Sequence, residues 1–263
     1  MERRDFIRTA TMAGLAIGFG SCYRHKKTHI LTLSWDDGFK KSFHKIAEIH
    51  ERYGLKACLN IIASAHTWAD IPNEYHSDPV GNFDDWNALK ARGHEIMPHT
   101  WKHTNLTEVS MDEAKELIDK CIDYFIDNLD RFDPATAVYN FAYNASTPEL
   151  ENYALSKVRA VRTGGWDILG DKQANPFPGD GGPLRLGCWS YGPDNADIWV
   201  NEGIERFLGD PAGGWLVLNL HGLDEEGWGP VSSNYLDKLL QKLVSIDYLD
   251  IRPAAETLNK YAF

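Results

Sequence analysis

Five residues with titratable side chains stand at or just beyond the ends of three strand-like runs of the sequence. Asp36 and Asp37 follow the run "HILTLSW", His99 ends "HEIMPH" with His103 four residues later, and His221 ends "WLVLNLH". In parallel α/β folds the carboxyl ends of the strands meet at one edge of the sheet, where chemistry gathers. We therefore expect a single pocket to collect these five side chains.

Two of these side chains have the spacing of metal ligands. His99 and His103 are separated by four positions, which on one turn of helix would place both imidazoles on the same face. Two imidazoles and one carboxylate are a common ligand set for catalytic zinc. One aspartate of the adjacent pair could complete this set, while the other would lie close enough to a coordinated water to accept its proton. Because a metal can lower the pKa of such a water from 15.7 to about 7, the pattern predicts that a hydroxide nucleophile is available at neutral pH.

His221 has a more ambiguous context. It follows a fully apolar run, where a histidine fits a packed core as well as a functional site. If it faces the metal, it is placed to protonate a leaving group, a role that contributes roughly 10²–10⁴ in rate. The pair of histidines lacks the glutamate of the HExxH metalloproteases, which argues against a peptidase.

Apolar runs of strand length alternate along the chain with segments of helical period. We expect strands at 29–35, 56–63, 94–99, 135–143, 159–163, 184–189, 215–221 and 248–251, and helices at 41–53, 83–92, 111–129, 148–158, 200–208 and 234–244. The stretch 164–193, which contains several Gly and Pro residues, is expected to be a long loop. Such alternation predicts parallel strands with right-handed crossovers, in a doubly wound sheet or a barrel. The length of 263 residues fits one domain of this kind.

The first 22 residues have the pattern of an export signal. Arginines precede a short apolar stretch, and small residues lead to Cys22; the stretch is too short to span a bilayer. "RRDFIR" resembles a twin-arginine signal, and "FGSC" resembles a lipoprotein cleavage site that would make Cys22 the lipidated first residue. We expect a catalytic domain at 23–263 and an exported protein, periplasmic or membrane-anchored, in a bacterium.

Charge and cysteine content narrow the class of partner. The net charge of −11 argues against nucleic acid or an anionic membrane surface as the partner, whereas a neutral or cationic substrate is easier to accommodate. Cys58, Cys121 and Cys188 lack CxxC spacing, so we expect buried thiols, with one disulfide possible, and no cysteine zinc site.

Three segments in this order, "LTLSWDDG", "HEIMPHTWKH" and "LVLNLHG", resemble motifs of the polysaccharide deacetylase family, carbohydrate esterase family 4. The resemblance runs from about residue 29 to 253. It implies a distorted (β/α) barrel with about seven parallel strands and a divalent metal, usually zinc. It further implies that Asp36 is the general base, that His221 is the acid, and that the metal is held by Asp37, His99 and His103. The implied reaction is hydrolysis of N- or O-acetyl groups on an acetylated oligo- or polysaccharide.

The chain departs from the family pattern in two places. Ala142 stands where the third motif carries an arginine that pairs with the base, so Asp36 lacks the charge partner that would hold its pKa down. Asn140 or Asn144 could orient Asp36 by hydrogen bonding instead. The fourth motif is matched by Trp166 and Asp167 in reversed order.

Aromatic and polar residues near the expected carboxyl edge are candidates for substrate binding. Apolar ring faces can stack on sugars, and the candidates are Trp35, Trp101, Asn144, Trp166, Asp167 and Trp228. Two alternatives to a glycan deacetylase stay open: a related hydrolase of small amides, and a non-catalytic protein that binds metal and glycan on the same scaffold.

Overall fold

The computed structural model describes residues 27–67, 79–179 and 184–261. The expected export signal and Cys22 lie outside these residues. The strands described are β1 (His29–Trp35), β2 (Cys58–Ile61), β3 (Glu95–Pro98), β4 (Val138–Asn140), β5 (Ala160–Gly164), β6 (Arg185–Ser190), β7 (Gly214–Leu220) and β8 (Leu249–Ile251). The α-helices are α1 (Lys40–Arg52), α2 (Phe83–Ala91), α3 (Met111–Asn128), α4 (Pro148–Leu155), α5 (Gly165–Leu169), α6 (Ala196–Leu208), α7 (Ser233–Leu243) and α8 (Ala254–Lys260).

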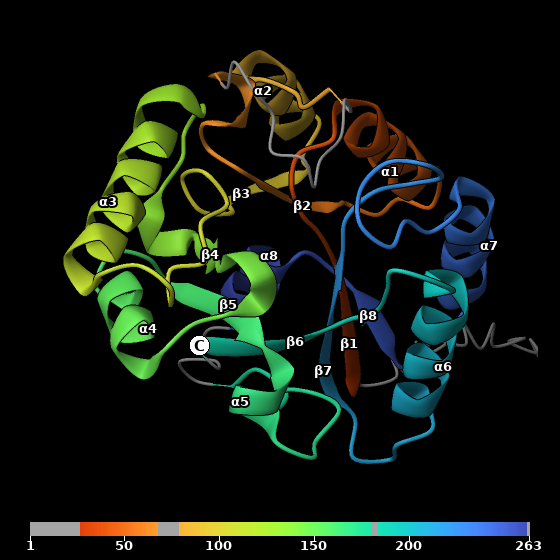
Figure 1. Ribbon diagram of the computed structural model, residues 1–263. Helices are drawn as coiled ribbons and strands as arrows, with labels where there is room; N and C mark the ends of the chain where they lie inside the picture. The colour runs from red at the N-terminus through yellow and green to blue at the C-terminus, as the bar shows by residue number, and fades with distance from the viewer. Residues whose placement is uncertain (1–26, 68–78, 180–183, 262–263) are drawn as a thin grey trace, which may run out of the picture.

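Seven parallel strands form a nearly closed barrel with helices around it (Figure 1). The strand order is β3-β2-β1-β7-β6-β5-β4, and β8 pairs with β1 at residues 29–31. The longest pairing joins β1 to β7 in register from His29↔Gly214 to Trp35↔Leu220. The strand ends that carry Asp36 and His221 are therefore neighbours. The order of the parallel strands and the helices around them confirm the expected (β/α) barrel.

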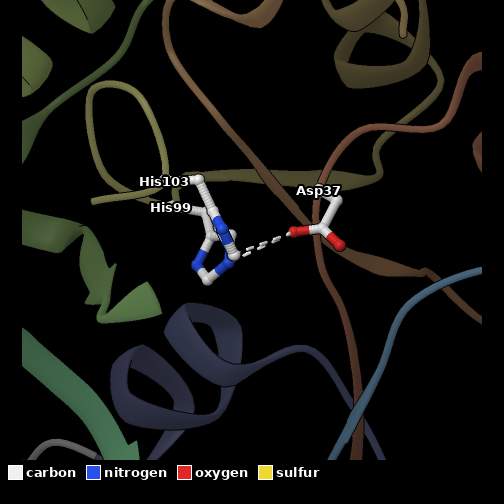
Figure 2. A group of neighbouring side chains, drawn as sticks. All are labelled: Asp37, His99 and His103. Carbon is white, nitrogen blue, oxygen red and sulfur yellow. Dashed lines mark ion pairs between the residues drawn. The ribbon is translucent and has the colours of Figure 1, made fainter. Parts of the chain in front are cut away.

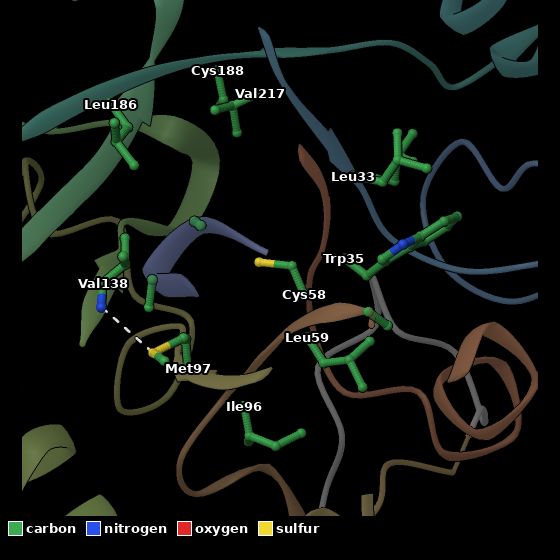
Figure 3. Close-up of a cluster of buried hydrophobic side chains, with 14 of the residues drawn as sticks. Leu33, Trp35, Cys58, Leu59, Ile96, Met97, Val138, Leu186, Cys188 and Val217 are labelled. Carbon is green, nitrogen blue, oxygen red and sulfur yellow. Dashed lines mark hydrogen bonds between the residues drawn. The ribbon is translucent and has the colours of Figure 1, made fainter. Parts of the chain in front are cut away.

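The two edge strands, β3 and β4, meet at a seam that side chains bridge. Asn140 Nδ2 donates to the carbonyl of Pro98 (3.1 Å), and the amide of Val138 donates to Met97 Sδ (3.5 Å; Figure 3). These bonds replace the backbone ladder that would otherwise complete the cylinder. We call this contact between β3 and β4 the barrel seam.

Strand alternation divides the side chains of the β1 segment between the interior and the exterior of the barrel. Asn60 Nδ2 donates to Ser34 Oγ (2.8 Å) and to Asp36 Oδ1 (2.7 Å), so these two residues of the β1 segment share the interior face. Because successive strand residues point to opposite faces, Leu33 and Trp35 point the other way, and Figure 3 shows them on the same side of β1. Both are buried in the main hydrophobic core.

The observed elements follow the expected ones closely, with two exceptions. α5 lies in the stretch 164–193 that was expected to be a loop, and α8 lies beyond the last expected strand, whereas β6 matches the strand expected at 184–189. Both helices are shorter than the window in which helical periodicity can be recognised. Among the described residues, the helices are too short or too polar for any of them to cross a membrane. Cys58, Cys121 and Cys188 are buried free thiols, as expected.

Candidate metal and active site

Asp37, His99 and His103 converge at the carboxyl end of the barrel. Asp37 Oδ1 lies 3.4 Å from His99 Nε2 and 3.5 Å from His103 Nε2, and both imidazoles face this carboxylate (Figure 2). One ligand atom from each residue lies within 4.8 Å of the other two. Asp37 follows β1 and His99 follows β3, so the sheet itself brings together residues that are far apart in sequence.

The two histidines reach each other through an irregular turn instead of the expected helical one. Residues 99–103 have no helical assignment, and Thr100 and His103 adopt left-handed φ values of 64° and 55°. Asp37, which faces them, has φ 83°. Left-handed backbone is strained for residues other than glycine and gathers at functional sites. His99 and His103 therefore meet at Asp37 through an irregular turn, and the expected shared helical face is not formed.

The polar contacts of this group fit a divalent metal. His99 Nδ1 lies 3.1 Å from the carbonyl of Asn140; since a carbonyl can only accept, Nδ1 carries the proton and Nε2 presents its lone pair to the site. Asp37 Oδ1 is buried and has no hydrogen-bond donor among the described residues. Burial raises the pKa of Asp37, but the neighbouring imidazoles of His99 and His103 outweigh this effect and leave the pKa well below its usual range. A buried, ionised and unbonded oxygen between two imidazole nitrogens is a metal-ligand arrangement.

Asp36 is held by three donors from three other strands. Asn60 Nδ2 donates to Oδ1 (2.7 Å), while Arg162 Nη2 (2.6 Å) and Asn219 Nδ2 (2.7 Å) donate to Oδ2. Burial raises the pKa of Asp36, but the positive charge of Arg162, together with smaller contributions from the neighbouring histidines, outweighs this effect and lowers the pKa overall. Asp36 is therefore an ionised carboxylate with a fixed orientation.

Arg162 supplies the positive charge that the third motif lacks. It comes from β5, is 1% exposed, and its Nη2 forms the ion pair with Asp36. Asn140 and Asn144, the expected substitutes, act one step further out: Asn140 donates to Asn60 Oδ1 and Asn144 donates to Asn219 Oδ1, each at 3.0 Å. One signal in the sequence could have found Arg162, since an arginine inside the apolar run "RAVRTG" must pair with a carboxylate if it is buried.

Asp36 and the group of Asp37, His99 and His103 line a cavity of about 440 Å³. His221 lines its wall, and burial lowers the pKa of its imidazole although Asp37 and Asp36 act in the opposite direction. The complete lining is Asp36, Asp37, His99, His103, Tyr143, Asn144, Ser190, Asn219, His221 and Trp228. All five residues singled out at the strand ends thus reach one pocket.

The candidates for substrate binding divide into two groups. Asn144 and Trp228 line the cavity. Trp35 is fully buried in the core, because strand alternation turns it away from the interior, so the expected substrate contact is not supported. Trp101 packs edge-on against Tyr124. Trp166, on α5, is 74% exposed and packs against Trp189. Asp167, on the same helix, is also exposed, and neither Trp166 nor Asp167 lines the cavity.

Three residues that line the cavity were not predicted from the sequence. Tyr143 is 52% exposed and its ring lies 4.5 Å from that of His103, Ser190 ends β6, and Asn219 lies two positions before His221. Asn219 could have been found, since a polar residue with the strand parity of His221 shares its face. Tyr143 could not, because its position depends on a left-handed φ of 57°.

Comparison with known proteins places the sequence and the fold. Residues 23–156 match the family described as polysaccharide deacetylase. A search of curated proteins found no match.

Solved structures share the fold at low sequence identity. The peptidoglycan deacetylase PdaC from Bacillus subtilis is 17% identical, with a TM-score of 0.54, over 89% of this chain and 92% of that one. A family 4 acetyl xylan esterase from Clostridium thermocellum, in complex with cobalt, is 14% identical, with a TM-score of 0.56, over 88% and 91%. A CE4-family pseudoenzyme from Bacillus anthracis is 13% identical, with a TM-score of 0.56, over 90% and 67%.

Proposed function

We propose that this chain, which belongs to the polysaccharide deacetylase family, hydrolyses acetyl groups on a glycan, with Asp36 as general base and His221 as general acid. The observation that carries the proposal is the convergence of Asp37, His99 and His103 within 4.8 Å in the cavity that Asp36 and His221 also line. The substrate is an acetylated oligo- or polysaccharide. N- and O-linked acetyl groups are both within the proposal.

Asp37, His99 and His103 would hold the divalent metal that this family uses, and we propose zinc because two imidazoles and one carboxylate suit it. The neighbour with cobalt shows that a related fold accepts another divalent ion. When bound, such an ion lowers the pKa of water and polarises a carbonyl oxygen.

Asp36 is suited to accept a proton from the attacking water. It lines the cavity beside the ligand group, and its lowered pKa keeps it ionised at neutral pH. The three donors fix the carboxylate, so that no reorientation is needed before proton transfer. Asp36 would therefore act as a weak but correctly placed base.

His221 would deliver a proton to the departing sugar oxygen or nitrogen. Burial lowers the pKa of its imidazole, which makes the protonated form a stronger acid toward the leaving group.

Acetate release tests the proposal. Purified protein is incubated with N-acetylated chitooligosaccharides, peptidoglycan and acetylated xylan, before and after chelation and after addition of zinc or cobalt. We expect release that chelation abolishes. Asp36→Asn should lose release while retaining metal, whereas His103→Gln should lose both. Release that survives chelation or Asp36→Asn contradicts the proposed mechanism.

A second candidate is a glycan-binding protein without catalysis. A pseudoenzyme shares the fold, so the fold alone does not imply turnover. Metal content and glycan affinity without acetate release on any of the three substrates would favour this candidate over the enzyme. A related hydrolase of small amides would instead release its product from small substrates and leave the three glycans untouched.

We also propose that residues 1–22 direct export and that Cys22 anchors the mature protein to the membrane. The family match begins at residue 23, directly after Cys22, which supports a boundary at this point. Cys22→Ala should move the protein from the membrane fraction of the bacterial envelope to the soluble one. An unchanged distribution would contradict the lipid anchor.

A further inference from the structure

The segment after β7 is fixed to the start of α1 by one buried carboxylate. Glu226 is 6% exposed, and its Oε2 accepts hydrogen bonds from the Ser42 amide (2.8 Å) and from Ser42 Oγ (2.5 Å). Ser42 Oγ in turn accepts from the amide of Leu223 (2.9 Å). We call residues 222–231 the acid loop, because it directly follows His221.

The start of α1 needs an acceptor from elsewhere in the chain. Its N-cap residue, Phe39, has no side-chain cap, and the first turn contains no acidic residue. It contains Lys40 and Lys41 instead, although the partial positive charge at a helix N-terminus disfavours cations. Glu226 therefore supplies both the missing acceptor and the missing negative charge. The same helix start lies just after Asp36 and Asp37.

The acid loop is seated without free space. Gly227 has φ 84°, and a Cβ there would lie 2.7 Å from Phe39 Cε2. Gly229 has φ 58°, and a Cβ there would lie 3.0 Å from the Cα of Gly192. Between these two glycines, the Trp228 ring packs edge-on against His221, with ring centroids 5.3 Å apart. It is 46% exposed and is one of the residues that line the cavity.

We propose that Glu226 is a positioning residue that keeps the acid loop in register with the Asp36–Asp37 turn and thereby holds Trp228 against His221. Two segments that contribute to the cavity wall, at residues 36–37 and 221–228, lie far apart in the sequence. The bonds between Glu226 and Ser42 connect the second of them to the helix that follows the first. Through Trp228, Glu226 determines the shape of the substrate-binding wall next to the acid. The expected effect on catalysis rests on the proposed function, whereas the role of Glu226 in positioning the acid loop and Trp228 does not.

The test compares Glu226→Ala with Glu226→Gln and with Glu225→Ala. Glu225 is the exposed neighbour in the same loop, so its replacement removes the same charge without touching Ser42. Trp228 is followed by ¹⁹F NMR of protein labelled with 5-fluorotryptophan, with its resonance assigned through Trp228→Phe. This readout requires no turnover, so failure of the loop proposal is distinguishable from failure of the deacetylase proposal.

We expect Glu226→Ala to broaden or shift the Trp228 resonance and to lower kcat/KM for acetate release at least about tenfold, since small misplacements in a site have effects of this size. Glu226→Gln retains an acceptor for Ser42 and should restore both readouts, and metal content should stay unchanged throughout. Where Glu226→Ala does not fold, Ser42→Ala gives the weaker form of the same change. A Trp228 resonance in the Ala variants of Glu226 and Ser42 that matches Glu225→Ala would overturn the proposal.

Discussion

Asp36 shows how a buried carboxylate can stay ionised when one expected partner is missing. Burial favours the neutral form, and Arg162, on β5, opposes it with an ion pair of 2.6 Å. Asn60 and Asn219 add amide donors that can serve an ionised oxygen but cannot replace its counter-charge. Arg162 thus pairs with Asp36 because its side chain reaches the barrel interior, although it does not stand at the position of the arginine in the third motif.

Replacing Arg162 by methionine should shift the pH dependence of acetate release. Without the positive charge, burial dominates and the pKa of Asp36 rises, so the acidic limb of kcat/KM moves to higher pH because the base must be ionised. Arg162→Lys should keep the limb close to that of the wild type. Breaking a buried pair also lowers the free energy of unfolding by about 3–5 kcal/mol. A Met variant whose limb does not move would show that Arg162 does not set the charge of Asp36.

At the scale of elements, the turn 99–103 positions the two histidines of the candidate metal site at the expense of local strain. Thr100 is β-branched, 1% exposed and has φ 64°, a rare conformation for such a residue. Two hydrogen bonds from the residues that follow β2 hold the turn in place. The amide of Ala63 donates to the Thr100 carbonyl (3.1 Å), and the amide of Ser64 donates to the Trp101 carbonyl (2.9 Å).

Thr100→Gly should therefore separate stability from metal affinity. Relief of the left-handed penalty, about 1–2 kcal/mol, exceeds the entropic penalty of glycine, about 0.5–1 kcal/mol, so the metal-free protein should unfold at higher denaturant concentration. Metal affinity should fall because the glycine turn samples more conformations before binding. Denaturant unfolding and metal titration measure the two effects, and Thr107→Gly in an exposed neighbouring segment serves as the control. Tighter metal binding in Thr100→Gly would contradict a strained, preformed turn.

The elements were more predictable than the contacts between them. Strand β1 was predicted with its observed bounds, and the five chemical residues reach one pocket, because parallel strands carry their carboxyl ends to one edge whatever the details. Trp35 was misplaced although the parity of its strand, one step from Asp36, already turned it outward. Arg162 and Tyr143 were missed for different reasons. The role of Arg162 follows only once the residues that face the barrel interior are known, and the position of Tyr143 depends on a left-handed backbone conformation that the sequence pattern does not reveal.

At the scale of the whole molecule, stability depends on pH through groups far from the cavity. His50 on α1 is 1% exposed, with Nδ1 2.8 Å from the Ile46 carbonyl, and burial lowers its pKa to about 4, with a smaller contribution from His94. The folded state therefore favours neutral His50, while the unfolded chain takes up a proton below pH of about 6.5. Stability contributed by this residue is present at neutral pH and is lost as the pH falls from about 6.5 toward 4.

His50→Gln should flatten this dependence. Between pH 7 and pH 5 the wild type should lose about 2 kcal/mol more in its free energy of unfolding than the variant does. Urea unfolding at the two pH values gives the difference, in which contributions from all other titrating groups cancel. Equal losses in the two proteins would show that His50 is not buried in its neutral form.

The barrel seam gives His99 a second role, in the mechanics of the fold. Its Nε2 faces Asp37 on the β1 side, and its Nδ1 binds the carbonyl of Asn140 across the gap between β3 and β4. An ion that draws Nε2 toward Asp37 therefore also fastens the two edges of the sheet, which side chains and not a backbone ladder hold together. Removal of the ion should show first as faster hydrogen exchange at the amides of β3 and β4, while β1 and β7 stay protected. An ion bound at the candidate site would thus also stabilise the closure of the barrel.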